Sequence, residues 1–285
     1  AQKEVPAKLL GHALLPANTM VAAPADAPAD LKVSGKFTTP GKRVEAVGTV
    51  MGLSGGRPTG LSTPFAGQPV QGMSGIRSLG NGEFLTLTDN GFGSKANSPD
   101  AMLFFHRLKA DFATGAIERL STTFLHDPDK KVPFRIANEG TEKRYLTGSD
   151  FDPESIQPVG GKFWIAEEFG PYLIRVDATG KVEAVFETAI DGQPARSPDH
   201  YAVTTPAAPN LPVAFNVRRS KGYEGMAQSP DGRFLLYNST DPQTGNDIWV
   251  VPMVGTRTPT VFLKTPFREL SAVFSPDGRW VAYQS

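Results

Sequence analysis

Residues 148–170, GSDFDPESIQPVGGKFWIAEEFG, decide the fold of this chain. They read as a strand, a Gly160-Gly161 turn and a second strand with alternating apolar residues, which is the pattern of a β-hairpin. The hairpin does not need its five carboxylates in order to fold. These carboxylates are Asp150, Asp152, Glu154, Glu167 and Glu168. Acid gathered at both ends of a strand pair predicts a sheet rim that binds a cation, above all a metal ion.

The same hairpin pattern recurs at residues 72–91, 222–240 and 269–285. The corresponding turns are Asn81-Gly82, Asp231-Gly232 and Asp277-Gly278. These are turn pairs typical of two-residue hairpin loops, and their spacing to the second strand hardly varies. Four hairpins built on one template predict a repeat architecture.

Each of the first three hairpins is followed by two further strand-like runs. These runs are residues 102–108 and 116–125, 172–177 and 182–190, and 247–253 and 259–264. Four antiparallel strands repeated around an axis form the blade of a β-propeller. The sequence therefore predicts an all-β propeller of four to six four-stranded antiparallel blades. The last hairpin has only two strands, and we expect the N-terminal strands to supply the other two and close the ring.

We expect residues 1–285 to form a single propeller domain. Its predicted parts are N-terminal strands and loops at 1–70, the main blades at 72–237 and a last blade segment at 238–285. Within the first part, strand-like runs occur at residues 8–15 and 44–53. The Gly/Pro-rich residues 54–71 predict a long, lid-like loop.

The composition excludes several classes of function. Lys+Arg and Asp+Glu number 29 each, so no net field favours nucleic acid or an anionic membrane as a partner. There is no cysteine, so any metal would have oxygen or imidazole ligands. No apolar run approaches the roughly 20 residues that cross a bilayer. The first residues, AQKEVPAKLLG, resemble an end left by signal cleavage, which predicts a bacterial-type periplasmic or secreted protein.

The aligned hairpins predict which side chains meet at the mouth of the propeller channel. The first strands begin with Ser74, Glu154, Glu224 and Ser271. The second strands end with Asp89, Glu167 and Glu168, Asn238 and Gln284. All of them carry side-chain oxygen, which a hard cation such as Ca²⁺ prefers. Turn capping explains the serines and Gln284 equally well. The predicted metal ligands are Asp89, Glu154, Glu224 and Asn238.

The remaining acidic and basic side chains are candidates for catalysis and substrate binding. Strand alternation points only one of Glu167 and Glu168 inward, and a carboxylate that does not bind the ion can act as a general base. Asp150 is a third catalytic candidate. No other repeat has acid at Asp150 or Asp152, so a role of both in shaping the loop stays open. The predicted substrate-binding residues are Arg218, Arg219, Lys221 and Tyr223, because a basic run can clamp a phosphate.

Four motifs in order carry a resemblance to a known family. They are LTLTDNGFGSKANSPD, LTGSDFDPES, FWIAEEFGPYLIRVDATGKV and SKGYEGMAQSPDGRFL. They resemble the family described as having esterase-like activity of phytase, over about residues 8–237. That resemblance implies a bacterial, often exported propeller linked to phosphoester hydrolysis. The acidic residues that it implies for the site are Asp89, Asp150, Asp152, Glu154, Glu167, Glu168 and Glu224.

Two further resemblances keep alternatives open. Tyr223-Glu224-Gly225 is similar to a pattern in calcium-dependent lactonase and paraoxonase propellers. Residues 238–285 resemble the TolB-like propeller repeats of protein-interaction and sensor domains.

Together these observations favour a metal-dependent hydrolase of phosphate esters, with Ca²⁺ or another divalent cation at the channel mouth. A lactonase or carboxylesterase of the calcium-propeller kind is one alternative, and a non-catalytic binding propeller is another. The expected partner is a small ester, with neither nucleic acid nor membrane, and the oligomeric state is open. Loops such as 54–71 and 191–217 are expected to set specificity.

Overall fold

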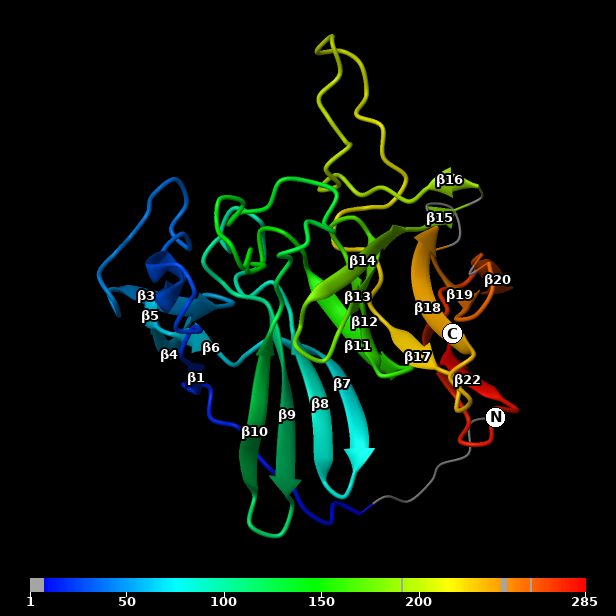
Figure 1. Cartoon of the computed structure of the whole chain (residues 1–285), viewed down its shortest axis with the longest axis horizontal. Helices are drawn as coiled ribbons and strands as arrows, with labels where there is room; N and C mark the ends of the chain where they lie inside the picture. Colours follow the sequence, from blue (N-terminus) through cyan, green and yellow to red (C-terminus); the bar gives the residue numbers. More distant parts are fainter. Residues whose placement is uncertain (1–7, 191, 242–244, 257) are drawn as a thin grey trace.

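The structure is a computed structural model that describes residues 8–190, 192–241, 245–256 and 258–285. Three four-stranded antiparallel sheets dominate it (Figure 1). The one helical element among these residues is the 3₁₀ turn η1 (Ala29–Lys32). The prediction of an all-β fold built from four-stranded blades is therefore confirmed.

Each blade is a meander in which consecutive strands are neighbours. The first blade contains β7 (Met73–Gly80), β8 (Glu83–Thr88), β9 (Phe104–Asp111) and β10 (Ala116–Phe124). The second contains β11 (Pro153–Val159), β12 (Lys162–Glu167), β13 (Tyr172–Val176) and β14 (Val182–Glu187). The third contains β17 (Met226–Gln228), β18 (Phe234–Asp241), β19 (Gly245–Pro252) and β20 (Thr260–Leu263).

Positive backbone angles close the predicted hairpin turns. Asn81 and Gly82 have φ values of 52° and 74°, and Gly160 and Gly161 have values of 59° and 74°. Positive φ at both central residues is the requirement of a type I′ turn, whose twist matches that of the flanking strands. In the second blade this turn fixes the register in which Val159 pairs with Lys162. These two turn pairs thus set which side chains share a face in the first two hairpins. At Asp231-Gly232 and Asp277-Gly278 only the glycines have positive φ, 69° and 70°, so these turns are of another type.

The first strands of the blades lie side by side in the order β7, β11, β17 and β21 (Leu270–Phe274). A Cβ added at Gly75 in β7 would lie 3.1 Å from the Cα of Ser155 in β11, so the two backbones approach closely. Apolar side chains fill the space between neighbouring blades. Leu87, Ile156 and Ile165 belong to the cluster between the first and second blades.

The described residues do not form the closed ring that the sequence predicts. β21 and β22 (Val281–Gln284) make a two-stranded sheet of their own. The N-terminal strands pair with one another instead, and they lie on the other side of the blades from β22 (Figure 1). Closure by N-terminal strands is therefore wrong for these residues, because those strands already satisfy each other's hydrogen bonds.

The N-terminal part also differs from expectation in its details. Its pairs are β1 (Met20–Val21) with β6 (Gln68–Pro69), β2 (Val33–Ser34) with β5 (Phe65–Ala66), and β3 (Val50–Ser54) with β4 (Arg57–Thr63). Residues 8–15 form no strand, and the run at 44–53 contributes only to β3. Residues 54–71 are not a plain loop, because Gly55 and Gly56, with φ values of 55° and 77°, turn β4 back onto β3.

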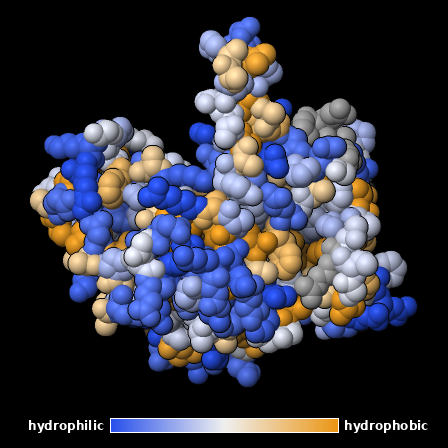
Figure 2. Space-filling view, turned by 45° about the horizontal axis from the view of Figure 1, so that its top comes forward, coloured by the Kyte–Doolittle hydropathy of each residue, from blue (hydrophilic) through white to orange (hydrophobic). Residues whose placement is uncertain are grey.

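One long excursion leaves the body of the molecule. After β15 (Ala189–Ile190) and β16 (Gln193–Pro194), the chain rises as a loop before it returns to β17 (Figure 1). The loop stands clear of the surface in the space-filling view (Figure 2). It returns beside the second blade, where a Cβ at Gly222 would lie 2.6 Å from the Cα of Glu168.

The packing between blades makes a prediction about Ile156. Its side chain is 1% exposed, whereas that of Ile76 is 66% exposed. Ile156→Ala should lower the free energy of unfolding by about 2–5 kcal/mol, because it leaves a cavity between the first two blades. Urea denaturation measures this, with Ile76→Ala as the matched control. Equal losses in the two variants would contradict the blade packing described here.

Candidate metal centre and active site

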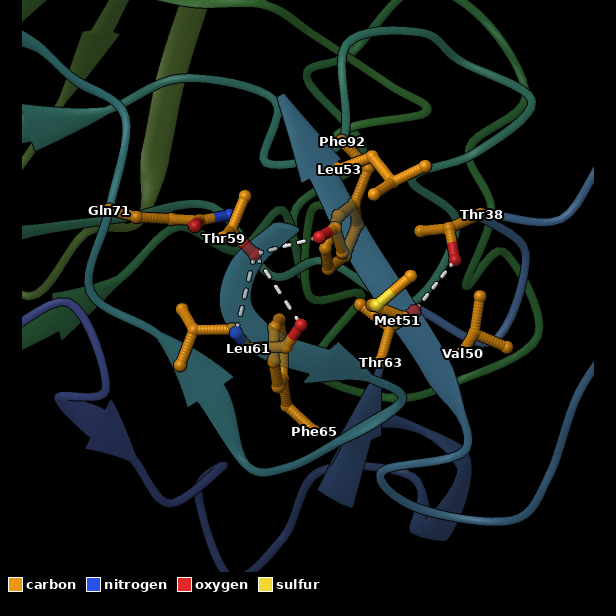
Figure 3. A pocket seen from close by; sticks show the side chains of 11 residues that line it. Thr38, Val50, Met51, Leu53, Thr59, Leu61, Thr63, Phe65, Gln71 and Phe92 are labelled. Atoms are coloured by element: carbon orange, nitrogen blue, oxygen red, sulfur yellow. Dashed lines mark hydrogen bonds between the residues drawn. The ribbon is translucent and has the colours of Figure 1, made fainter. Parts of the chain in front are cut away.

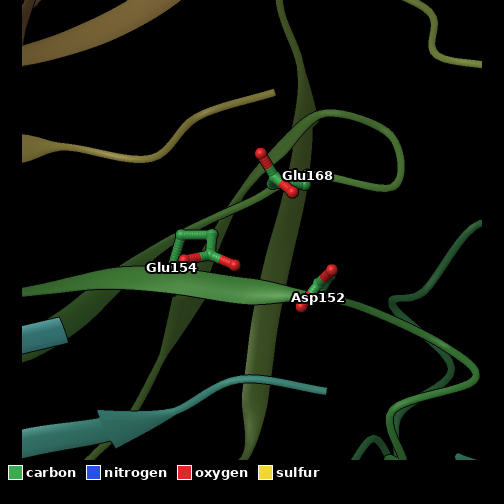
Figure 4. Close-up of side chains that lie close together, drawn as sticks. All are labelled: Asp152, Glu154 and Glu168. Carbon is green, nitrogen blue, oxygen red and sulfur yellow. The ribbon is translucent and has the colours of Figure 1, made fainter. Parts of the chain in front are cut away.

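Three carboxylates come together at one end of the β11–β12 hairpin. Asp152 immediately precedes β11, Glu154 lies within it, and Glu168 follows β12. One oxygen from each residue lies within 4.8 Å of the others (Figure 4). Glu154 lies where the β11–β12 register shifts, between Pro153 and Ser155, and such a bulge redirects a side chain. Glu168 joins them because its backbone N–H donates to the carbonyl oxygen of Asp152 at 3.0 Å.

The electrostatics of this acidic cluster, Asp152, Glu154 and Glu168, favour a cation. Burial, followed by repulsion from the other two carboxylates, raises the pKa of Glu154 to about 8. Burial and neighbouring charges raise the pKa of Glu168 to about 7 and that of Asp152 to about 6. Several anionic groups held together away from water are costly unless a positive charge compensates them.

The set of donor atoms fits a hard divalent cation. It consists of carboxylate oxygens, and a hydroxyl is at hand because Ser74 hydrogen-bonds to Glu154. Asp89 is close enough for its charge to raise the pKa values of both Asp152 and Glu154. Oxygen ligands are those of Ca²⁺ and Mg²⁺, while structural zinc sites favour sulfur and imidazole.

A glycine places Asp89 beside the acidic cluster. The Asp89 N–H donates to the carbonyl oxygen of Gly72 at 2.8 Å, and its Oδ1 accepts from the Gly91 N–H at 2.7 Å. A Cβ at Gly72, whose φ is 60°, would lie 2.4 Å from the Asp89 carboxylate. Any larger residue at position 72 would displace that carboxylate.

Glu167 and Asp150 are occupied by the backbone. Glu167 is fully buried, and its carboxylate accepts from the N–H groups of Phe169, Gly170 and Tyr172 at 2.7–2.8 Å. Asp150 accepts from the N–H groups of Ala137 and Thr147, each at 2.8 Å. Through these contacts Glu167 shapes the turn after β12, and Asp150 shapes the loop before β11. The predicted catalytic roles of Glu167 and Asp150 gain no support from this geometry.

Glu224 and Asn238 do not join the acidic cluster. Glu224 is exposed, lies 3.5 Å from the Nζ of Lys221, and acts on Glu168 only through its charge. It precedes the three-residue β17, whereas Glu154 lies inside β11. Asn238 is buried, and its Nδ2 donates to the carbonyl oxygen of Glu269 at 2.8 Å, which joins β18 to the start of the last hairpin.

The predicted substrate-binding residues separate into two groups. Arg218 and Arg219 are exposed, and the Nε of Arg219 lies 2.9 Å from the Oδ2 of Asp199. Lys221 is positioned near Glu168, whose pKa its charge lowers. Tyr223 is 1% exposed and packs edge-on against Tyr237, with ring centroids 4.8 Å apart. Tyr223 is therefore a core residue, and its predicted contact with substrate gains no support from this geometry.

Two residues that sequence reasoning set aside or missed belong to the site. Asp152 was implied by the family resemblance but given no metal or catalytic role, because no other repeat has acid at that position. Lys95 could not have been predicted, because its neighbours are distant in sequence. Its Nζ donates to the carbonyl oxygen of Asp199 at 2.8 Å and lies 4.8 Å from the ring centroid of Phe169. Burial lowers its pKa, while the charge of Glu167 raises it.

Comparison with known proteins identifies a family. The model of the phytase-like family, described as esterase-like activity of phytase, matches residues 68–258. The match begins later and ends later than the predicted range of 8–237. No curated protein matches this sequence.

Three solved structures are similar over much of the chain. The periplasmic gluconolactonase PpgL of Pseudomonas aeruginosa has 13% identity and a TM-score of 0.36, over 88% of this chain and 74% of its own. A candidate 6-phosphogluconolactonase from Bacteroides uniformis has 13% identity and a TM-score of 0.35, over 79% and 67%. A candidate TolB from Agrobacterium tumefaciens has 16% identity and a TM-score of 0.33, over 65% and 50%. This chain thus spans half of the TolB chain. Scores this low carry no information about activity.

The raised pKa values predict how stability depends on pH when divalent cations are chelated. The folded protein holds protons on the cluster at pH values where unfolded carboxylates, with pKa values of about 4, have lost them. The free energy of unfolding should therefore fall as pH rises from 5 to 8. Glu154→Gln should lessen this fall by roughly 1–3 kcal/mol, because it removes the group with the highest pKa in the cluster.

Urea denaturation at pH 5, 6, 7 and 8 in a chelating buffer tests this expectation. Glu118→Gln is the matched control, because Glu118 is exposed on the outer strand of the first blade. Its pH dependence should equal that of the unmodified protein. If Glu154→Gln also has the pH dependence of the unmodified protein, repulsion among the three carboxylates does not lower the stability of the folded protein.

Proposed function

This chain belongs to the phytase-like family, described as esterase-like activity of phytase, and from that premise we propose that it is a divalent-cation-dependent hydrolase of phosphate esters. The observation that carries the proposal is the acidic cluster, in which Asp152, Glu154 and Glu168 bring carboxylate oxygens within 4.8 Å of one another. The cation proposed is Ca²⁺, although another divalent ion with oxygen ligands would fit the same side chains. When bound, such an ion supplies Lewis-acid polarisation of a phosphoryl oxygen.

The side chains of the site have two roles, cation binding and proton transfer. Asp152 and Glu154 hold the cation, with Asp89 beside them at the end of β8. Glu168 is the general base that takes a proton from the attacking water. Its carboxylate lies within 4.8 Å of those of Asp152 and Glu154, so it is next to the place where they would hold the ion and its water.

The surrounding charges favour an anionic ester. Lys221 interacts with Glu168, and Arg219 is close enough to Lys95 for their charges to repel. Of these cations, Lys221 acts on a carboxylate of the acidic cluster and can pair with a phosphate oxygen. A lactone or carboxylic ester presents a neutral carbonyl and makes no use of this charge. We therefore place the phosphate ester first, and the neutral ester is the second arm of the test.

The setting of the protein follows from less specific observations. Among the described residues, none belongs to a helix that is long and apolar enough to span a membrane. A periplasmic or secreted location stays a prediction. The partner is a small-molecule ester.

The proposed role of Glu168 predicts the effect of Glu168→Gln. With p-nitrophenyl phosphate mono-, di- and triesters and Ca²⁺, this variant should lower kcat by about 10²–10⁴-fold, because glutamine cannot accept the proton. A chelator should abolish turnover by the unmodified protein. Glu118→Gln is the control and should keep full activity.

Three outcomes distinguish a phosphoesterase from a lactonase or esterase and from a binding propeller. Loss of turnover in Glu168→Gln with an unchanged thermal melt supports the phosphoesterase. Turnover of gluconolactone or p-nitrophenyl acetate, but of no phosphate ester, would replace it with a lactonase or esterase. Absence of turnover on every substrate in the presence of Ca²⁺ would support a binding propeller.

A further inference from the structure

A pocket of about 290 Å³ lies at the base of the long excursion, where the chain leaves β16 (Figure 1). Its walls come from β16, from Arg196 and from residues 214–216 of the returning leg. A larger cavity of about 430 Å³ is lined partly by the β3–β4 hairpin (Figure 3), but none of its lining residues, all of which are described, carries a charge. The smaller pocket is the one whose lining indicates the chemistry of a ligand.

Hydrogen bonds between the two legs of the excursion hold the walls of this pocket. The N–H of Arg196 donates to the Oδ1 of Asn216 at 2.7 Å, and the Nδ2 of Asn216 donates to the carbonyl oxygen of Pro194 at 3.0 Å. The N–H groups of Asn216 and Val217 both donate to the carbonyl oxygen of Arg196 at 3.0 Å. Ala195 and Val217 are buried in a small apolar cluster. The amide of Asn216 is thus used in joining the legs.

Arg196 is the one charged side chain among the lining residues, all of which are described. Its Nε is buried, and no described residue accepts a hydrogen bond from it. The charge of Arg196 acts on Tyr172 and His200, but burial raises the pKa of Tyr172 and lowers that of His200, so both are neutral near pH 7. Glu187 acts on the same two groups and is paired with the Nε2 of His200 at 3.0 Å. A buried donor on a cation is costly without an acceptor, which favours an anionic ligand.

The rest of the lining adds an apolar surface beside this cation. Pro194, Ala214 and Phe215 line the pocket and are exposed, and Phe215 is 48% exposed. A ligand that covers them removes apolar area from water. The planar guanidinium matches two oxygens of a carboxylate or a phosphate. The pocket therefore fits an anion that also carries an apolar group.

We propose that this pocket binds a small organic anion, which presents two oxygens of a carboxylate or a phosphate to Arg196 and lays its apolar part against Phe215. The inference does not rest on the proposed function, because none of the lining residues belongs to the acidic cluster. A bound anion would also tie together the two legs of the excursion, whose returning leg brings Lys221 and Gly222 to Glu168.

Calorimetric titration of the whole, metal-free protein with benzoate tests this inference, in a buffer that contains no other carboxylate and no phosphate. The unmodified protein should bind benzoate at least about tenfold more tightly than acetate, because the ring covers Phe215. Arg196→Met should weaken the binding of benzoate by about tenfold or more, because it removes the charge and keeps an apolar stem. Arg279→Met is the matched control, because Arg279 is exposed beside the turn of the last hairpin, and it should bind like the unmodified protein.

A second titration with phenyl phosphate separates a phosphate ligand from a carboxylate. Whichever of the two probes binds more tightly gives the class of the ligand, provided that Arg196→Met weakens its binding. Phe215→Ala, at an exposed position, should weaken the binding of benzoate by about threefold or more and leave that of acetate unchanged. This variant keeps the test decisive if Arg196→Met does not fold.

Failure of the inference and failure of the proposed function give different results. Binding that is lost in Arg196→Met with an unchanged thermal melt supports the pocket even if no ester is hydrolysed. No binding of either probe by the unmodified protein, or equal binding of benzoate by a folded Arg196→Met or by Phe215→Ala, would overturn the inference even if phosphate esters are hydrolysed. Equal affinities for benzoate and acetate would overturn it too, since they would indicate an adventitious ion only.

Discussion

The close approach of three carboxylates at the end of one hairpin is the interaction on which the site depends. Asp152, Glu154 and Glu168 would repel one another less if the hairpin were displaced by a single residue, since that would turn Glu154 to the other face. The Gly160-Gly161 turn fixes the register from Val159–Lys162 to Ser155–Ala166, and the shift between Pro153 and Ser155 then sets the position of Glu154. The fold therefore holds these carboxylates close together, and the bound cation that we propose would compensate their charge.

Neighbouring parts of the chain support this arrangement. Glu167 holds the turn after β12 by accepting three backbone N–H groups, so Glu168 is presented from a rigid segment. The first blade supplies Asp89, which Gly72 allows to approach. The loop that returns from the long excursion packs Gly222 against Glu168 and brings Lys221 with it. Three segments far apart in sequence thus meet at one end of the second blade.

Local patterns predicted the part of the fold that local physics controls. The four hairpins and their following strands were predictable because turn pairs and alternation act within about 20 residues. The N-terminal strands were not, because β1, β2 and β3 find partners among one another that no short-range pattern specifies. Closure of the ring failed as a prediction for the same reason.

The site residues that lie near one another in the sequence were the ones that could be predicted. Glu154 and Glu168 came from one hairpin, and Asp152 was implied by the family resemblance. Glu224 and Asn238 were placed by analogy between repeats, and their contacts in the structure are with Lys221 and with the backbone of Glu269. Tyr223 faces the core, and Lys95 approaches the site only through tertiary contacts. Such facts depend on packing between blades, which spacing along the chain does not encode.

Direct titration of the metal-free protein with Ca²⁺, followed by calorimetry, tests the central claim that the cluster is a cation site. The account predicts saturable binding that Glu154→Gln weakens by about tenfold or more, while Glu118→Gln leaves it unchanged. Absence of binding by Ca²⁺ and by Mg²⁺, or equal binding by Glu154→Gln, would contradict it.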